Sequence, residues 1–253
     1  MEGVFQSDHV LLKQQERVLT ITLNRAEKKN ALSGDMYKAI TSALAYAAAE
    51  ESVYAVLVTG SNDCFTAGND LADFMQSELG NNAPVMLFLR QLIDFEKPLV
   101  AAVNGVAVGI GITMLLHCDL VYIGENTRCR LPFVNLGLVP EAASSVLLPN
   151  IMGHQRAAEL LMLGDFFDGR KAASYGIANQ ALPDGDAVTQ RAVEQVNKLA
   201  QQPREALRLT RRLLKKREYD PVEHRIGEEG MIFAKQLRSK EAMDIMQAFF
   251  AGD

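Results

Sequence analysis

Two glycine-containing segments have the residue types needed to bind an oxyanion. They are the run FTAGNDL over residues 65–71 and the run NGVAVGIG over residues 104–111. Each follows an apolar stretch typical of a strand, over residues 54–59 and 99–103. Glycine lets a backbone approach a ligand oxygen closely, and preorganised N–H groups in a dry site stabilise developing negative charge. A single such turn is usually only a strand-to-helix connection, but the ordered pair predicts an oxyanion hole suited to forming the enolate of a thioester.

Enolate chemistry also needs a general base, and Glu141 has the surroundings that such a base requires. A carboxylate in apolar surroundings has a raised pKa, which suits it to remove a proton from carbon. The neighbours of Glu141 are apolar: Leu138, Val139, Val146, Leu147 and Leu148. The alternative is that Glu141, directly after Pro140, only interacts with the dipole at the start of a helix.

The elements that must position these residues follow from apolar spacing. Residues 9–14 and 17–23 predict a hairpin, and residues 120–123 a further buried strand. Ser33 is the predicted cap of a helix whose buried stripe is Met36, Ile40, Leu44 and Ala47. Short strands separated by single helices indicate stacked β-β-α units.

The last part of the chain is predicted to be helical over residues 188–200, 203–218, 222–237 and 239–250. Pro203 and Pro221 occupy first-turn positions, and Ser239 is a further helix cap. We place a boundary near residue 194. Residues 1–194 then form the core that carries the site, and residues 195–253 form a helical region.

The composition favours a folded, metal-free domain over a nucleic-acid-binding or membrane protein. The chain has 253 residues, is 48% hydrophobic and carries a net charge of -5, which favours a folded domain and argues against a general binder of nucleic acid or anionic membrane. Its three cysteines have no zinc-ligand spacing. The first ten residues do not resemble a signal or transit peptide, and the apolar runs are too short to span a bilayer. We therefore expect a cytoplasmic protein with no metal site and no membrane partner.

The motifs also carry a resemblance that extends over most of the chain. LNR (23–25), NAL (30–32), FTAGNDL, KP (97–98) before AAVNGVAVGIG (101–111), CDL (118–120) and LGLVPE (136–141) occur in the order seen in the crotonase superfamily of enoyl-CoA hydratases and isomerases. The resemblance implies an α/β crotonase-type (ClpP/crotonase) spiral of β-β-α units with a C-terminal helical trimerisation region. It also implies a homotrimer or a dimer of trimers.

The resemblance assigns the catalytic positions. The backbone N–H groups of Asn69 and Ile110 are the implied oxyanion donors, although the family often has glycine where Ile110 stands. Hydratases of the family carry two glutamates at the positions of Thr113 and Phe133, and neither residue can act as a carboxylate base. Glu141 occupies the position of the catalytic glutamate in the Δ3,Δ2-enoyl-CoA isomerases of the peroxisomal type.

The resemblance also implies where an acyl-CoA substrate binds. Coenzyme A is expected to pass along the turn at residues 28–32, and the substrate site is completed by residues from both glycine segments and the Glu141 region. For Asp70 we favour helix capping over catalysis. Asn135 and Ser144 or Ser145 are further candidates for the acyl end. The predicted substrate-binding residues are Lys28, Lys29, Asn30, Ala31, Leu32, Ala67, Gly68, Asp70, Leu71, Gly109, Phe133, Leu138 and Pro140.

Together these features predict a Δ3,Δ2-enoyl-CoA isomerase that acts by a Glu141-mediated 1,3-proton shift. It would need no cofactor beyond the coenzyme A of its substrate. An enoyl-CoA hydratase, or another crotonase-type lyase or hydrolase, is the alternative. A non-catalytic oligomeric or RNA-binding relative is a third possibility, since residues 204–217 are strongly basic. Aromatic residues are not interleaved there, so we expect a solvated outer helix face, and we expect His117 to be a hydrogen-bonded core residue.

Overall fold

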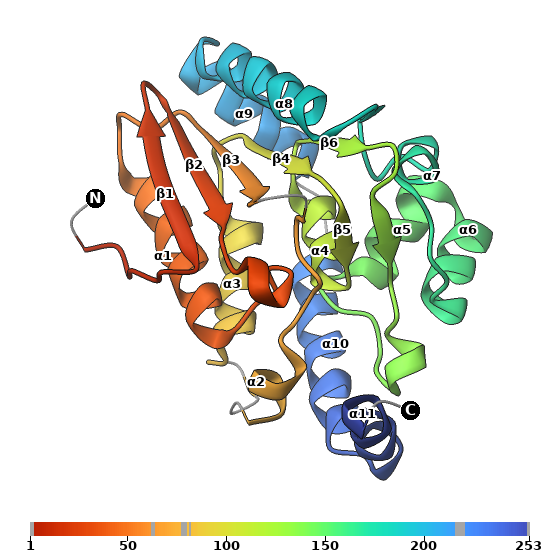
Figure 1. Ribbon diagram of the computed structural model, residues 1–253. Helices are drawn as coiled ribbons and strands as arrows, with labels where there is room; N and C mark the ends of the chain where they lie inside the picture. The colour runs from red at the N-terminus through yellow and green to blue at the C-terminus, as the bar shows by residue number, and fades with distance from the viewer. Residues whose placement is uncertain (1–2, 62–63, 77–79, 81, 216–220, 252–253) are drawn as a thin grey trace.

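The structure is a computed structural model of the 253-residue chain, and it describes all residues except 1–2, 62–63, 77–79, 81, 216–220 and 252–253. A six-stranded sheet forms its centre (Figure 1), in the order β1-β2-β3-β4-β6-β8. β1 and β2 form the predicted antiparallel hairpin, and the other neighbouring strands are parallel. The bounds are Val10–Gln15 (β1), Val18–Leu23 (β2), Ala55–Gly60 (β3), Leu99–Val103 (β4), Leu120–Gly124 (β6) and Gln180–Leu182 (β8).

Both faces of this sheet are covered, because alternate residues of its strands enter different cores. Leu57, Val100 and Ala102 pack with the buried side of α8 (Gly185–Ala200). Their neighbours Val58 and Ala101 belong to a larger core with the buried sides of α1 (Gly34–Ala49) and α3 (Pro84–Asp94). In α1 the predicted stripe is buried, and the Ser33 hydroxyl accepts the Met36 N–H at 3.4 Å.

A second, two-stranded sheet brings the two glycine segments together. It pairs β5 (Val106–Val108) with β7 (Arg128–Arg130) in parallel. Thr66 lies beside β5: its N–H donates to the Val106 carbonyl at 3.0 Å, and its own carbonyl accepts the Val108 N–H at 3.1 Å. The segments 65–71 and 104–111 are therefore adjacent strands of chain, as the oxyanion hypothesis requires.

Short helices connect these strands and shape the site. They are η1 (Ala26–Lys28), α2 (Leu71–Gln76), α4 (Ile110–Thr113), η2 (Met114–His117), η3 (Val134–Leu136), α5 (Ser144–Met152), α6 (His154–Ala158), η4 (Glu159–Leu163) and α7 (Gly169–Ser174). The structure places α5 against η2 and α10, so the segment that follows Glu141 lies between two helical layers.

The predicted C-terminal helices are present as α8, α9 (Arg204–Lys215), α10 (Pro221–Leu237) and α11 (Lys240–Ala251). The Ser239 hydroxyl accepts the Ala242 N–H at 3.1 Å, which confirms this cap. Residues 216–218 of the predicted second helix lie outside the described residues. Residue 194 lies inside α8, a helix that covers the sheet, so the division at that point stays a prediction.

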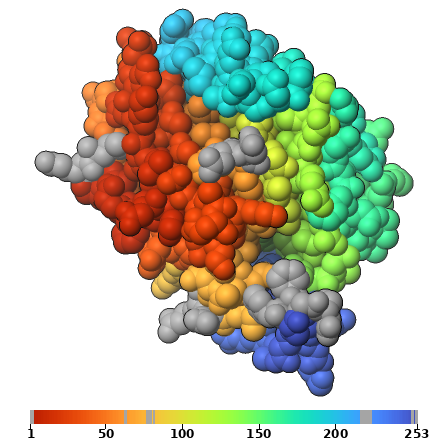
Figure 2. All heavy atoms as spheres, viewed as in Figure 1, coloured from red at the N-terminus to blue at the C-terminus, as the bar shows by residue number. Residues whose placement is uncertain are grey.

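Helix α10 returns to the site region, where it contacts α3 and α5. The space-filling view shows the C-terminal residues at the lower edge of the molecule, beside the α2 region (Figure 2). There Phe233 of α10 meets Phe74 of α2 edge to face, with ring centroids 5.5 Å apart. Within the part of the chain described, no helix is both long and apolar enough to cross a membrane.

The expectation that the cations of α9 form a solvated outer face is wrong for Arg211, and the exposed Lys215 also binds back to the protein. Arg211 is buried; its Nε donates to the Asp119 carboxylate at 2.7 Å, and its Nη1 donates to the Phe95 carbonyl. Lys215 donates to the His117 carbonyl at 2.6 Å. Arg211 points inward because the Asp119 carboxylate and the Phe95 carbonyl accept its hydrogen bonds. By contrast, the apolar side chains of Leu213 and Leu214 on the same helix are 74% and 80% exposed.

Candidate active site

In the first glycine turn, one backbone N–H donates to none of the residues that the structure describes. The Leu32 N–H donates to the Gly68 carbonyl at 2.8 Å, and the Leu32 carbonyl accepts the Asp70 N–H at 2.9 Å. Neither of these two hydrogen bonds uses the N–H of Asn69, which lies between Gly68 and Asp70. Gly68 has φ +97°, and a Cβ there would lie 2.9 Å from the Val108 carbonyl oxygen. Glycine is therefore required both by the turn and by the close approach of the second segment.

The second free N–H belongs to the start of α4. Gly109 precedes the helix with φ 55° and ψ -117°, and Ile110 is its first residue. The first N–H groups of a helix have no intrahelical acceptor, so the Ile110 N–H is available to a ligand. A Cβ on Gly111 would lie 2.7 Å from the Thr66 side chain, so this glycine lets α4 pack directly against the first segment.

Glu141 lies close to these turns as a buried carboxyl group. It is 7% exposed, and within the described ranges its Oε1 has no hydrogen-bond partner. Burial raises the pKa of Glu141 to about 8, and the nearby Glu229 adds to the rise. The polar side chain of Asn69 acts in the opposite direction and stabilises the carboxylate. A carboxyl group in this state can both take up and release a proton near neutral pH.

Tyr37 holds the Asn69 side chain that faces Glu141. Its hydroxyl donates to Asn69 Oδ1 at 2.5 Å, and the residue is only 2% exposed. Burial, followed by the charge of Glu141, raises the pKa of Tyr37, so it remains a neutral donor. Sequence reasoning missed Tyr37. It directly follows Met36 of the predicted stripe, and nothing in the sequence marks its hydroxyl as functional.

Glu229 of α10 is the second residue that sequence reasoning missed. Its Oε2 accepts the Ala143 N–H at 2.7 Å, and its Oε1 accepts both the N–H and the hydroxyl of Ser145, at 3.1 and 2.5 Å. Burial raises the pKa of Glu229 to about 6, although these hydrogen bonds act to lower it. A signal existed: Glu229 occupies the apolar stripe between Ile226 and Phe233, at helical spacing.

Glu141 lines two neighbouring cavities, which also share Phe74 and Phe233. The larger, of about 720 Å³, is bordered by the cations Lys29, Arg128 and Arg130. The guanidinium groups of Arg128 and Arg130 lie 4.5 and 4.9 Å from the centroid of the Phe166 ring, which also lines the cavity.

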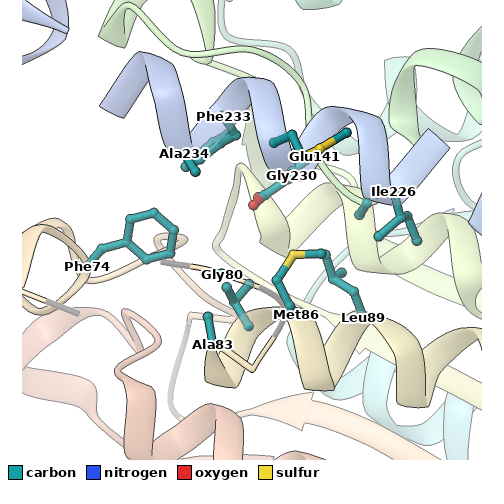
Figure 3. A pocket seen from close by; sticks show the side chains of 14 residues that line it. Phe74, Gly80, Ala83, Met86, Leu89, Glu141, Ile226, Gly230, Phe233 and Ala234 are labelled. Carbon is teal, nitrogen blue, oxygen red and sulfur yellow. The ribbon is translucent and has the colours of Figure 1, made fainter. Parts of the chain in front are cut away.

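The smaller cavity, of about 270 Å³, is lined by apolar side chains, glycines and the carboxyl group of Glu141. Figure 3 shows it between α3, which contributes Met86 and Leu89, and α10, which contributes Ile226 and Phe233, with Glu141 at its wall. Both cavities are therefore lined mainly by apolar residues and share Glu141, Phe74 and Phe233, and the larger one also carries the three cations.

The structure brings many of the predicted substrate-binding residues to the larger cavity. Those that line it, besides Asn69 and Glu141, are Lys29, Ala67, Gly68, Leu71, Gly109, Phe133 and Leu138, and Asn135 lines it as well. Other predicted residues are not among the lining residues of either cavity: Lys28, Asn30, Ala31, Leu32, Asp70, Ile110 and Pro140.

Two of the residues away from the cavities have structural roles. Asn30 is fully buried and bridges the turn: its Oδ1 accepts the Arg25 N–H at 2.7 Å, and its Nδ2 donates to the Cys64 carbonyl at 2.7 Å. Asp70 caps α2 by accepting the Ala72 N–H at 3.1 Å, as predicted, and pairs with Arg25 at 2.7 Å. Although burial acts to raise it, the pKa of Asp70 is lowered by these partners, which makes Asp70 a poor base.

The remaining candidates near Glu141 are neutral. Thr113 is fully buried. His117 is the predicted core histidine: its Nε2 donates to the Ala142 carbonyl at 2.8 Å, and burial lowers its pKa to about 4. Among the described side chains, His, Cys, Asp and Glu form no group of three that could hold a metal ion.

Comparison with known proteins agrees with this architecture. Residues 13–251 match the enoyl-CoA hydratase/isomerase family. A solved structure of OdaA from Pseudomonas aeruginosa is 45% identical and superposes with a TM-score of 0.94, covering 96% of this chain and 99% of that one. The fold is the crotonase fold, with a spiral α/β core and a C-terminal helical region.

Curated relatives include both reaction types. Enoyl-CoA delta isomerase 2 from Rattus norvegicus is 33% identical over 251 residues, which are 96% of this chain and 64% of the relative. The chain therefore spans slightly less than two thirds of that protein's length. The 2,3-dehydroadipyl-CoA hydratase of Escherichia coli K12 is 29% identical over 243 residues, covering 95% of this chain and 94% of the relative. On the extent of these matches, the chain belongs to the enoyl-CoA hydratase/isomerase family.

Proposed function

We propose that this protein is a Δ3,Δ2-enoyl-CoA isomerase. The observation that carries the proposal is the position of Glu141, a single buried carboxyl group of raised pKa between a cation-bordered cavity and an apolar one. A base for removing a proton beside a thioester must be protected from water and have a pKa near the working pH. Similarity to the rat isomerase over nearly the whole chain supports the same reaction.

The proposed reaction is a 1,3-proton shift through one base. The Glu141 carboxylate removes a proton from C2 of a 3-enoyl-CoA, and the electrons move onto the thioester oxygen to give a dienolate. The N–H groups of Asn69 and Ile110 stabilise that oxygen, an interaction for which one donor typically contributes about 2.7 to 4 kcal/mol. Protonated Glu141 then returns the proton at C4, which leaves the double bond between C2 and C3. Conjugation with the thioester drives the reaction, and no metal or redox cofactor takes part.

The two cavities suggest how the substrate is held. The apolar cavity beside Met86 and Phe233 suits the acyl chain. The cations Lys29, Arg128 and Arg130 at the larger cavity suit the phosphates of coenzyme A, since exposed cations attract phosphate in a mouth of low dielectric. The thioester carbonyl would then lie between the two cavities, next to Glu141.

Hydration is the second candidate, and the Escherichia coli relative is its support. It needs two groups that hold and activate a water, and the second carboxyl group near Glu141 is Glu229. Both oxygens of Glu229 already accept hydrogen bonds from the Ala143 and Ser145 region. Thr113 and Phe133 supply no carboxylate either. The arrangement therefore favours isomerisation over hydration.

The test is an assay with 3-hexenoyl-CoA, in which the conjugated product is followed by its ultraviolet absorbance. We expect the wild type to convert it and the Glu141→Gln variant to lose conversion, with little hydration of a 2-enoyl-CoA by either protein. Hydration faster than isomerisation would replace the proposal by its alternative. Absence of both activities in the wild type would direct attention to acyl-CoA hydrolysis and RNA binding.

We also propose that the chain assembles as a homotrimer or a dimer of trimers. The support in this structure is the exposed apolar side of α9, where Leu209, Leu213 and Leu214 face solvent. Such a patch on a folded protein usually marks an interface. Light scattering on the wild type and on a Leu213→Lys variant tests the idea, because a monomeric wild type would contradict it.

A further inference from the structure

The turn that carries Glu141 has a backbone conformation that needs external support. Ala142 and Ala143, which follow it directly, have φ values of 58° and 56°. The left-handed region is unfavourable for a residue with a Cβ, and two successive alanines persist there only when their surroundings hold them. The position of Glu141 therefore depends on the groups that fix residues 142–145.

These supporting groups act from two sides. On one side the His117 ring donates to the Ala142 carbonyl at 2.8 Å. On the other, the Glu229 carboxylate accepts the Ala143 N–H at 2.7 Å, the Ser145 N–H at 3.1 Å and the Ser145 hydroxyl at 2.5 Å. Glu229 is 5% exposed, so these three donors, rather than water, satisfy it.

We infer that Glu229 is the positioning residue of this site: from α10, its carboxylate holds the turn that aims Glu141 between the two cavities. This inference rests on the proposed isomerase function. A carboxylate is needed because it only accepts hydrogen bonds, on two oxygens. A glutamine would keep the shape, but it would lose one acceptor and would place an N–H₂ group against an N–H donor.

The charge of Glu229 also acts on the base. Among the described residues, the titratable groups that bear on this pair are Tyr37 from α1, which stays neutral, and Arg225 on α10, which stabilises the charge of Glu229. His117 from η2 is neutral above about pH 4. Glu229 is thus the negative neighbour of Glu141, and its removal should make Glu141 easier to ionise.

The experiment compares Glu229→Gln with Glu228→Gln. Glu228 is the adjacent glutamate of the same helix; its side chain is 44% exposed and pairs with Arg225 at 3.2 Å. We expect Glu229→Gln to lower kcat by about tenfold or more while KM changes little, because a displaced base affects the transition state more than substrate binding. We also expect the pH midpoint of kcat to fall, and Glu228→Gln to match the wild type in both respects.

A second readout does not depend on activity. Difference infrared spectra across pH report the protonated carboxyl band of Glu141, assigned by its loss in Glu141→Gln, and its midpoint should fall in Glu229→Gln. Wild-type kcat together with an unshifted infrared midpoint in that variant would overturn the inference. If the wild type is no isomerase, the proposed function fails, and the infrared titration still decides the role of Glu229.

A shorter carboxylate covers the case in which Glu229→Gln does not fold. Glu229→Asp keeps the charge but cannot reach all three donors. Glu229→Asp should lower kcat without moving the pH midpoint of kcat. A loss of charge alone would instead move the midpoint. Wild-type kcat in Glu229→Asp would show that the hydrogen bonds to the turn are unimportant, and the inference would fall.

Discussion

Replacing Glu141 by glutamine should stabilise the folded protein at neutral pH while removing the proposed base. The reason is that the fold opposes ionisation of this group. Its pKa rises from 4.5 to about 8 on burial among apolar side chains and near Glu229. Glutamine has nearly the same shape and accepts the Asn69 side chain with its carbonyl oxygen, but it has no proton to lose.

The sign and size follow from proton linkage. Between pH 4.5 and about 8 the folded state keeps a proton that the unfolded state has lost. The free energy of unfolding of the wild type then falls by about 1.4 kcal/mol per pH unit. The stabilisation by the bound proton is complete below pH 4.5 and is lost as pH rises through the folded pKa. The advantage of Glu141→Gln should therefore grow with pH, reach about 3 kcal/mol near pH 7, and level off above about pH 8.

The assay is urea unfolding of wild type and variant over about pH 5 to 9, at one protein concentration so that any assembly contributes equally. Glu228→Gln, a change at a half-exposed position of α10, serves as the control and should show no such trend. The slope of the difference with pH is the quantity to compare, because any change in packing adds only a constant. A difference that does not vary with pH would refute the reasoning, since it would mean that Glu141 ionises in the fold like an ordinary glutamate.

Three further predictions concern activity. Initial rates of the proposed isomerisation should rise with pH to a midpoint near 8, because Glu141 must be ionised to act, and a profile that is flat from about pH 6 to 9 would contradict this role. Gly68→Ala should lower kcat by about tenfold or more, because φ is +97° there and the new Cβ would lie 2.9 Å from the Val108 carbonyl oxygen, which displaces the turn that carries the Asn69 N–H. Wild-type kcat in a folded Gly68→Ala variant would show that the Asn69 N–H is not a donor. Tyr37→Phe should leave Asn69 Oδ1 without its donor and cost about 1 to 3 kcal/mol of stability together with part of kcat, as measured by urea unfolding and the ultraviolet assay; no change in either would mean that the Tyr37 contact is dispensable.

Local pattern determined much of the fold. The hairpin, strands β3, β4 and β6 of the central sheet, the Ser33 and Ser239 caps and the four C-terminal helices agree with the structure, because each depends on spacing within a few residues. Strand β8 was not predicted. The two glycine segments were found in the same way, whereas the role of Glu141 was assigned from the resemblance to a known family. The structure places both segments side by side and Glu141 against the same cavity.

Only the tertiary structure decided how the base is held and tuned. Tyr37 reaches Asn69 across 32 positions of sequence, and Glu229 reaches Ser145 across 84. Arg211 turns inward because Asp119, 92 positions away, ends up beneath it. Apolar spacing reports which side of a helix is buried, but it carries no information on which distant group lies opposite. The pKa of Glu141 depends on the same distant groups and on the removal of water by the whole fold, so the sequence named the base and the three-dimensional arrangement set its chemistry.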